Sequence, residues 1–458
     1  MTADSQSGRR TSLHGEWSSR FAFILAVAGS AVGLGNVWKF PYITGVYGGG
    51  AFVIFYLFCV FAIGLPIMMA EILIGRRGRR NPVATMSLLG EEEAGSSTWR
   101  FVGMLGVITG VLILSYYSVI AGWAFAYMWQ GAAGNFTGLN AAAVGDIFAG
   151  LSESAVMTGF WHTVFMGMTI VVVAKGVERG LEKAVRVLMP ALIGLLLVLL
   201  GYSMVAGNFA AGLDFMFAPR FSELTQEGAL VALGHAFFTL SVGMGAVMAY
   251  GAYLPDEHSI AKTSMAIVAA DTAIAILAGL VIFPIVFQNG LNPASGPGLI
   301  FQSLPLAFGQ LPGGQFVAAM FFLLLTFAAW TSAISLMEPG VAWIIESLKL
   351  SRPVAAWSMG GAIWLFGLLS VLSFNALSEV TFLRGTIFAN IDFLTSNIML
   401  PLGGFAIICF AGWFMSHNST ADEIDPEAGR GYRAWRFAAR YIAPIAVAMI
   451  FLNAIGVF

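Results

Sequence analysis

The sequence predicts an all-α membrane protein with many transmembrane helices. Of its 458 residues, 58% are hydrophobic and only 10% are charged, and the mean hydropathy is +0.84. Apolar runs of about twenty residues, each long enough to cross the hydrocarbon core of a bilayer, recur along the whole chain. Clusters of glycine interrupt two of these runs, although helices in lipid rarely tolerate a break without a functional reason.

We expect eleven spans, near residues 21–46, 48–75, 101–130, 159–175, 186–206, 229–254, 264–288, 314–346, 354–373, 385–414 and 437–457. Cys59 and Cys409 both fall inside apolar runs, so we interpret them as small buried hydrophobic residues. The N-terminus has no signal-peptide pattern, and the first span is expected to remain as an anchor. A net charge of −2 gives no indication of nucleic-acid binding.

The basic residues predict the orientation, because loops on the cytoplasmic side are enriched in Lys and Arg. With the N-terminus in the cytoplasm, all but Lys39, Arg220 and Arg384 of the 22 Lys and Arg residues lie on that side. Eleven spans then put the C-terminus outside. We therefore expect a multi-pass protein of the plasma membrane, in bacteria the inner membrane.

The glycine clusters lie in the first span, over Gly29–Asn36, and in the sixth, over Phe238–Gly245. Each glycine costs a helix roughly 1 kcal/mol relative to alanine. Five spans separate the two clusters, so the broken helices enter the membrane from opposite sides, as an inverted-repeat transporter requires. The alternative for one cluster is close helix packing. Two clusters at matching places, with hydroxyl or amide side chains beside them, favour a binding site.

Polar residues within the spans indicate what binds. Asp271 in the seventh span would take a cation as its partner, unless that span begins later and the carboxylate lies near its end. Asn36 and Thr239 would be neutral oxygen donors to the same cation. The adjacent hydroxyls of Thr331 and Ser332 suggest a second cation site, against the alternative that each bonds to its own backbone.

Other ionisable residues within spans are less specific. Lys39 and Asp392 extend to the interface in one interpretation and pair with each other as a gate in the other. His235 is interpreted as a packing residue rather than a proton relay. Glu71 and Glu338 also lie within spans.

Together these residues resemble the neurotransmitter:sodium symporter family, the LeuT-type transporters, and within it the bacterial eleven-helix members that carry hydrophobic amino acids. The resemblance covers nearly the whole chain and rests on Gly29–Pro41, Gly48–Phe52, Gly64–Pro66 with Glu71 and Gly75-Arg76, Tyr116-Tyr117, Phe237–Ser241 and Thr331-Ser332. It implies the LeuT fold, a 5+5 inverted repeat with broken first and sixth helices. The implied divisions are a cytoplasmic tail (1–20), the first repeat (21–206), an extracellular connection (207–228), the second repeat (229–414), a cytoplasmic loop (415–436) and the eleventh helix (437–458).

The resemblance also implies two Na⁺ sites and a substrate pocket. The first Na⁺ site would use the carbonyl of Ala31, the side chains of Asn36, Thr239 and Asp271, and the substrate carboxylate. The second would use the carbonyls of Gly29, Val32 and Ala328 and the hydroxyls of Thr331 and Ser332. The pocket would be lined by Ala31, Gly33, Ile113, Tyr117, Phe238, Ser241, Met244 and Leu336. Tyr117 would bind the carboxylate, Phe238 would cover the site, and Glu71 would steady the unwound sixth helix.

Departures from the family pattern refine the expectation. Members that carry monoamines have an aspartate where this chain has Gly33, which leaves room for an amino-acid carboxylate. Chloride-dependent members have serine and glutamine where this chain has Ala275 and His235. Here Asp271 would supply the negative charge that chloride supplies in those members, so we expect chloride independence.

The gates depart from the family pattern as well. The outer gate would be Lys39–Asp392 instead of an Arg–Asp pair. The inner gate would be His14–Glu346, with Trp17 and Tyr253 nearby, which introduces a titratable group. The family's usual twelfth helix is expected to be absent.

The function expected from the sequence is Na⁺-coupled uptake of a neutral L-amino acid by alternating access. The flexible Met244 favours bulky hydrophobic or aromatic substrates, unless it serves only packing. The expected partners are this small-molecule substrate and the bilayer, without nucleic acid or an obligatory protein partner. The alternatives are a proton-coupled permease and a non-transporting amino-acid sensor. An enzyme is not expected, since the sequence offers no catalytic pair or metal cluster at suitable spacing.

Overall fold

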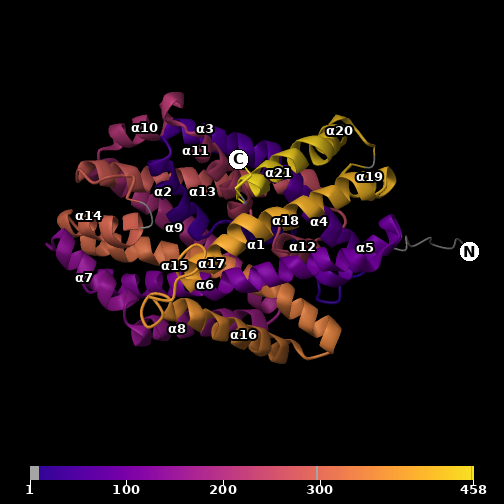
Figure 1. Ribbon diagram of the computed structural model, residues 1–458, viewed down its shortest axis with the longest axis horizontal. Helices are drawn as coiled ribbons and strands as arrows, with labels where there is room; N and C mark the ends of the chain where they lie inside the picture. Colours follow the sequence, from indigo (N-terminus) through magenta and orange to yellow (C-terminus); the bar gives the residue numbers. More distant parts are fainter. Residues whose placement is uncertain (1–9, 296–297, 426, 455, 458) are drawn as a thin grey trace, which may run out of the picture.

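The computed structural model describes residues 10–295, 298–425, 427–454 and 456–457. These residues are mainly helical, and they form no strand beyond an isolated bridge between Phe382 and Gly385. Most of the helices run along the long axis of the molecule, so that their ends gather at its two extremities (Figure 1). The all-α prediction is confirmed. The first nine residues of the expected tail, 1–9, lie outside the described residues.

In chain order the α-helices are α1 Arg20–Ala31, α2 Phe40–Val46, α3 Gly50–Cys59, α4 Leu65–Gly78, α5 Pro82–Ala94, α6 Arg100–Ala132, α7 Ala141–Ser152, α8 Ala155–Ala174, α9 Lys183–Ala206, α10 Phe209–Phe217, α11 Gln226–Thr239, α12 Ala246–Gly251, α13 Ile260–Gln288, α14 Leu304–Gln310, α15 Gly314–Leu348, α16 Arg352–Leu372, α17 Ile387–Phe393, α18 Leu400–Cys409, α19 His417–Ile424, α20 Arg430–Phe437 and α21 Ala443–Ala454. Short π-helical turns join several of them into longer continuous helices, such as Gly50–Gly78 and Ile387–Phe414.

Nine continuous helices in the described ranges are long and apolar enough to cross a membrane. A tenth span consists of Arg20–Ala31 and Gly35–Val46, which meet at a bend of 49°. The remaining expected span, 229–254, is divided between α11 and α12, and neither part is long enough to cross alone. Multiple transmembrane helices are therefore confirmed, whereas the count of eleven stays a prediction.

Two predicted boundaries differ from the structure. The helix expected from residue 186 begins at Val177, and the one expected from residue 437 begins at Arg430. In both places a charged helical turn precedes the apolar run, so hydropathy alone starts the span too late. Short helices also form in the connections. For example, Asn81 caps α5 by accepting from the backbone of Val83 and Ala84.

Backbone conformation explains why both expected breaks form. After α1, Val32 adopts an extended conformation with ψ of 100° and ends the helix. In the second break Ser241, Gly243 and Gly245 all have positive φ, at 53°, 86° and 74°. A right-handed helix cannot contain such residues, so the chain unwinds between α11 and α12. The backbone groups freed at the two breaks then need partners.

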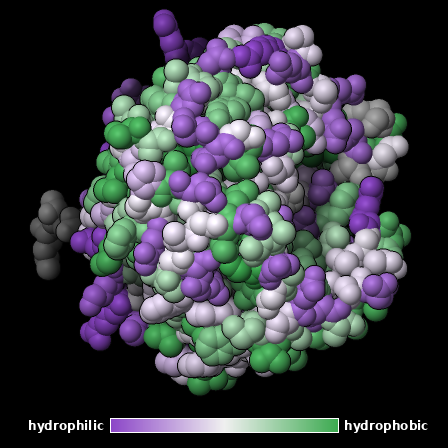
Figure 2. Space-filling model, turned by 90° about the vertical axis from the view of Figure 1, so that its left-hand side faces the viewer, coloured by the Kyte–Doolittle hydropathy of each residue, from purple (hydrophilic) through white to green (hydrophobic). Residues whose placement is uncertain are grey.

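Close packing sets the two broken helices against their neighbours. A Cβ atom on Gly75 of α4 would overlap the carbonyl of Met248, so α12 lies directly against α4. Gly106 and Gly110 of α6 face the unwound segment less tightly, since their Cβ atoms would lie 3.1 Å from the Gly245 nitrogen and 3.6 Å from the Met244 carbonyl oxygen. The end of the molecule that carries α7, α10 and α14 has hydrophilic side chains scattered among hydrophobic ones (Figure 2). The opposite end, here called the basic end, carries Arg76 and Arg77 in the last turn of α4 and Arg79 and Arg80 directly after it.

Candidate functional site

The two unwound segments contact each other in the interior. The Ser241 hydroxyl donates a hydrogen bond of 2.9 Å to the carbonyl of Ser30, which lies in the last turn of α1. Glu71, fully buried on α4, accepts the backbone N–H of Gly243 at 2.5 Å. A buried carboxylate thus holds the second break in place from a third helix, which is where the sequence analysis placed Glu71.

A first group of oxygen atoms surrounds Asp271 of α13. The amide nitrogen of Asn36 donates to Oδ1 of Asp271 at 2.8 Å. The amide oxygen of the same Asn36 side chain accepts the Gly33 N–H at 3.0 Å. The Thr239 hydroxyl lies 3.1 and 3.2 Å from the two carboxylate oxygens. The carboxylate is completely buried, and its hydrogen-bond partners within the described residues are neutral.

This environment fits a monovalent cation. A buried carboxylate is costly unless an opposite charge compensates it. Neutral and anionic oxygens are the ligands that hard cations prefer, and no group of three His, Cys, Asp or Glu residues in the described chain offers a transition-metal site instead. Asn36, Thr239 and Asp271 would hold the cation, with Ala31 of the expected set lining the adjacent cavity.

A second group of oxygen atoms lies where α1 ends. The Ser332 hydroxyl of α15 is 3.3 Å from the carbonyl oxygen of Val32 and 3.5 Å from that of Gly29. The neighbouring Thr331 hydroxyl donates to the Ala328 carbonyl at 3.0 Å. Thr331 therefore bonds to its own helix, whereas Ser332 faces the open carbonyls of the broken one. Three carbonyls and two hydroxyls without a net charge fit a second hard, singly charged cation.

A small internal cavity of about 20 Å³ lies between the two breaks. All eight residues expected to bind substrate line it, together with Ser30, Gly35 and Ser332: Ala31, Gly33, Ile113, Tyr117, Phe238, Ser241, Met244 and Leu336. The Tyr117 hydroxyl accepts the Leu34 N–H at 3.1 Å and so touches the first break directly. A space of this size holds about one water molecule, so a larger guest requires the flexible Met244 and its neighbours to move.

A wider cavity of about 440 Å³ adjoins the small one, since Tyr117 and Phe238 line both. Lys39 and Asp392, the expected outer gate, line this wider cavity but form no ion pair within 4.0 Å. The Lys39 ammonium instead lies 4.7 Å from the centre of the Phe238 ring, and Asp392 accepts from the Ser396 hydroxyl at 3.1 Å. The gate pair is therefore separated, and a wide space leads towards the substrate cavity.

The basic end is sealed. His14 Nε2 lies 2.9 Å from Glu346 Oε1, and these side chains are only 4% and 7% exposed. Glu346 also accepts the Asn81 N–H at 2.7 Å. Trp17 donates its backbone N–H to the Tyr253 carbonyl at 3.0 Å. The four residues expected at the inner gate are thus brought together, and they tie the segment before α1 to α5, α12 and α15.

One part of this closure was not anticipated. Glu338, fully buried on α15, pairs with Arg352 through contacts of 2.5 and 3.0 Å and accepts the Tyr253 hydroxyl at 2.9 Å. Glu338 was expected within a span, but no partner was predicted for it. The signal that was missed is an arginine at the start of the next span, just across the short turn that joins α15 to α16.

The role of Ser30 was also missed. Its carbonyl accepts from both Ser241 and Ser332, at 2.9 and 3.0 Å, and so links the two breaks with α15. Its position inside the first glycine cluster was the available signal.

This combination defines a class of protein. A secondary transporter has broken membrane helices with cation-binding oxygens at the breaks. It also has a path to the binding site that is open at one end and sealed at the other, as in this structure. The chain belongs to the sodium:neurotransmitter symporter family, whose sequence model matches residues 14–139 and 144–458.

Relatives and a solved structure agree with this assignment. The chain is 37% identical to the uncharacterized sodium-dependent transporter YhdH of Bacillus subtilis, over 96% of this chain and 98% of the relative. It is 30% identical to an uncharacterized sodium-dependent transporter of Haemophilus influenzae, over 95% and 97% of the two chains. The crystal structure of MhsT in complex with L-phenylalanine matches with a TM-score of 0.89 and 42% identity, covering 96% of this chain and 99% of that one. The expected LeuT fold and Na⁺-dependent transport are therefore confirmed.

Proposed function

We propose that the protein imports neutral L-amino acids with bulky hydrophobic or aromatic side chains, driven by two Na⁺ ions and independent of chloride. The observation that carries this proposal is the fully buried Asp271 carboxylate, whose partners Asn36 and Thr239 are neutral. The same unwound segment that brings Asn36 to this carboxylate also lines the substrate cavity. MhsT, the similar solved protein, holds L-phenylalanine.

The substrate carboxylate would bind beside Gly33 and Tyr117. Both lie at the first break, and the Tyr117 hydroxyl offers a donor towards the cavity. Bound Na⁺ would supply the positive charge that joins this carboxylate to Asp271, so ion and substrate would stabilise each other. Ile113, Met244 and Leu336 form an apolar wall for the side chain, which supports a hydrophobic substrate.

Two Na⁺ ions provide enough driving force for accumulation. Each charge that crosses about 100 mV contributes about 2.3 kcal/mol, and a tenfold gradient adds about 1.4 kcal/mol per ion. The sum of about 7 kcal/mol corresponds to an amino-acid gradient of about 10⁵-fold.

The proposed topology places the basic end in the cytoplasm of a cell whose plasma membrane holds the protein. The arginine loop beside the sealed end supports this orientation. The wider cavity then faces outward, and the C-terminus lies outside. Residues 21–206 and 229–414 would be the two inverted repeats, each with its first helix broken.

Proteoliposome uptake tests the proposal. Purified protein is assayed with a panel of radiolabelled amino acids, with Na⁺ or K⁺ outside and with chloride or gluconate as the anion. Uptake of phenylalanine-like substrates should require Na⁺ and be unaffected by the anion. Asp271→Asn should weaken Na⁺-dependent substrate binding by about 30-fold or more, since the loss of one member of a buried charge pair costs about 2–5 kcal/mol.

The matched control is Asp146→Asn, which changes an exposed aspartate of α7. Unchanged binding by Asp271→Asn without chloride would remove Asp271 from the ion site. Uptake driven by a pH gradient without Na⁺ would favour a proton-coupled permease. Na⁺-dependent binding without accumulation would indicate a sensor.

A further inference from the structure

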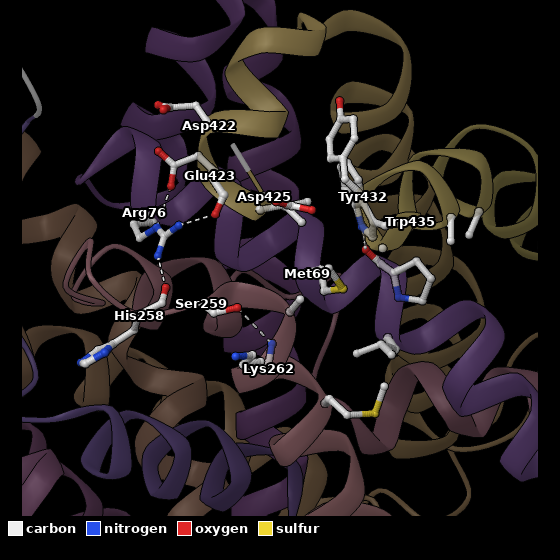
Figure 3. A pocket seen from close by; sticks show the side chains of 18 of the residues that line it. Met69, Arg76, His258, Ser259, Lys262, Asp422, Glu423, Asp425, Tyr432 and Trp435 are labelled. Atoms are coloured by element: carbon white, nitrogen blue, oxygen red, sulfur yellow. Dashed lines mark hydrogen bonds and ion pairs between the residues drawn. The ribbon is translucent and has the colours of Figure 1, made fainter. Parts of the chain in front are cut away.

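A second cavity lies apart from the substrate site, at the basic end of the molecule. It measures about 890 Å³ and is enclosed by α4, α13, α19, α20 and the connection before α13 (Figure 3). None of the residues assigned to substrate, ions or gates lines it. Its mouth is charged, whereas Phe61, Leu65, Met69, Met265 and Ile442 make one of its walls apolar.

A fixed frame holds the mouth open. Arg76 of α4 donates to the Glu423 carboxylate, to the Glu423 carbonyl and to the His258 carbonyl, each at 2.6 Å. Trp435 donates its ring N–H to the Pro66 carbonyl at 3.1 Å. These bonds join α4 to α19, α20 and the connection before α13. Because Arg76 already has buried partners, it serves the frame rather than a guest.

Two charged groups at the mouth remain available. Lys262 of α13 is exposed, and its ammonium has no carboxylate within 4.0 Å among the described residues. Asp425, just after α19, accepts the Gly429 N–H at 3.0 Å and has no basic partner within the described chain. They come from different walls of the cavity (Figure 3). The mouth thus offers the ammonium of Lys262 and the carboxylate of Asp425, while the other carboxylates there, Glu257 and Asp422, lie beside the basic side chains of His258 and Arg77.

The cavity follows the continuous helix Gly50–Gly78 over about the depth of one membrane leaflet. Phe61 on its apolar wall and Arg76 at its mouth are separated by about 22 Å of helix at 1.5 Å per residue. Half the hydrocarbon core plus the headgroup region of a bilayer is about 20 Å deep. Phe61, Met265 and Ile442 are 39%, 46% and 39% exposed, so this wall is open from the side on which lipid lies.

We propose that this cavity binds a zwitterionic aminophospholipid, phosphatidylethanolamine, from the leaflet at the basic end; its cytoplasmic location rests on the proposed topology. The lipid ammonium would donate to Asp425 and its phosphate would accept from Lys262, while an acyl chain follows the apolar wall. Phosphatidylcholine matches the charges but cannot donate a hydrogen bond. Phosphatidylglycerol has no ammonium for Asp425 and would meet the additional carboxylates of Glu257 and Asp422 at the mouth.

Native mass spectrometry of the delipidated full-length protein tests the proposal. The protein is titrated with phosphatidylethanolamine, phosphatidylcholine and phosphatidylglycerol of identical acyl chains. We expect the first lipid to bind several-fold more tightly than the other two. Asp425→Asn should reduce this preference by up to about fivefold, as an exposed ion pair contributes up to about 1 kcal/mol. Lys262→Ala should instead lower the affinity for all three lipids by a similar factor, because each of them carries the phosphate. Asp425→Asn keeps an acceptor for Gly429 and should leave the frame intact.

One further variant and two control variants test the position of the site. Ala434→Trp fills the mouth from an exposed position of α20 without removing a charge, and it should abolish the preference. Lys183→Ala and Glu178→Gln are the matched controls, since both change exposed charges outside the cavity and should leave the preference unchanged. Equal affinity for the three lipids, or loss of the preference in the controls, would overturn the proposal.

A soluble competitor distinguishes a lipid from a free headgroup. Glycerophosphoethanolamine at millimolar concentration should not displace the lipid, because it cannot contact the apolar wall. Complete displacement would overturn the lipid assignment in favour of a soluble phosphoamine. These measurements use no substrate, Na⁺ gradient or uptake, so their failure and the failure of the proposed transport function are separate results.

Discussion

The structure allows the effect of a substitution at Gly33 to be predicted quantitatively, from the space around its Cα atom. A Cβ atom there would lie 2.5 Å from the Ser332 hydroxyl oxygen and 2.8 Å from the Tyr117 hydroxyl oxygen. Both distances are well inside van der Waals contact, and both oxygens belong to the proposed site. Gly33→Ala must therefore displace Ser332, Tyr117 or the first break. Overpacking of this kind costs about 1–3 kcal/mol.

This cost predicts a loss of substrate affinity of about fivefold to 150-fold, at 1.4 kcal/mol for each factor of ten. The assay is equilibrium binding of radiolabelled substrate to purified protein over a range of Na⁺ concentrations. Because Ser332 belongs to the proposed second ion site, the Na⁺ concentration for half-maximal binding should rise as well.

Two other glycines calibrate the result. Gly29→Ala should have a smaller effect, because its Cβ would lie 3.3 Å from the flexible Met189 side chain and from Thr331. Gly194→Ala is the control, since no atom lies within 4 Å of the added Cβ on α9. Wild-type affinity in Gly33→Ala, or an equal loss in Gly194→Ala, would refute the reasoning.

Variants of three further residues follow from the site. Tyr117→Phe removes the hydroxyl that accepts the Leu34 N–H and should weaken substrate binding about tenfold, consistent with the loss of a hydrogen bond to a charged group; wild-type affinity would argue against a carboxylate contact. Glu71→Leu should abolish Na⁺-dependent binding, because it removes the acceptor of the Gly243 N–H. Glu71→Gln keeps such an acceptor and should retain most of the binding. Equal losses in the two variants would assign Glu71 another role. His14→Arg keeps a permanent charge beside Glu346. Reagent accessibility of a cysteine in the inner pathway should therefore be no higher in His14→Arg than in the wild type, whereas His14→Ala, which removes the partner of Glu346, should raise it. Equal accessibility in His14→Ala and the wild type would show that this pair does not hold the basic end shut.

The sequence allowed the breaks and their neighbours to be predicted because the signals there are local. Glycines in an apolar run, and Asp271 among alanines, are unusual in lipid whatever surrounds them. The structure brings Asn36, Thr239 and Asp271 within hydrogen-bonding distance although they lie in three different spans. The two matching breaks suggested that these residues share one cation, and the resemblance to a known family supplied the complete ligand sets, since hydropathy alone contains no information about which spans adjoin.

The parts that were not predicted depend on contacts between distant segments. The pairing of Glu338 with Arg352 requires the angle of the turn between α15 and α16. The cavity beneath Arg76 requires α19 and α20 to fold back onto α4, and these helices lie in a segment expected only as a loop. Amphipathic helices at a membrane surface bury one face and expose another, so their mean hydropathy resembles that of a loop.

The separated outer gate leads to a prediction about rate rather than affinity. Lys39 lies over the Phe238 ring, a cation–π contact worth about 0.5–1 kcal/mol at exposed sites. To pair with Asp392 it must leave that ring for a salt bridge worth about 0–1 kcal/mol near solvent. The exchange is nearly balanced, so the pair alone cannot hold the outer path shut. Closure must depend on the substrate, with Asp392 easing the movement of Lys39.

Asp392→Asn should therefore leave equilibrium substrate affinity within about twofold, yet lower the uptake rate several-fold, about the effect of 1 kcal/mol on a barrier. Asparagine keeps an oxygen that accepts from Ser396, so the local helix should be unchanged. Binding and uptake measured on the same preparation separate the two effects. An equal fall in both would place Asp392 in the binding site. Unchanged uptake would mean that Lys39 closes the path through Phe238 alone.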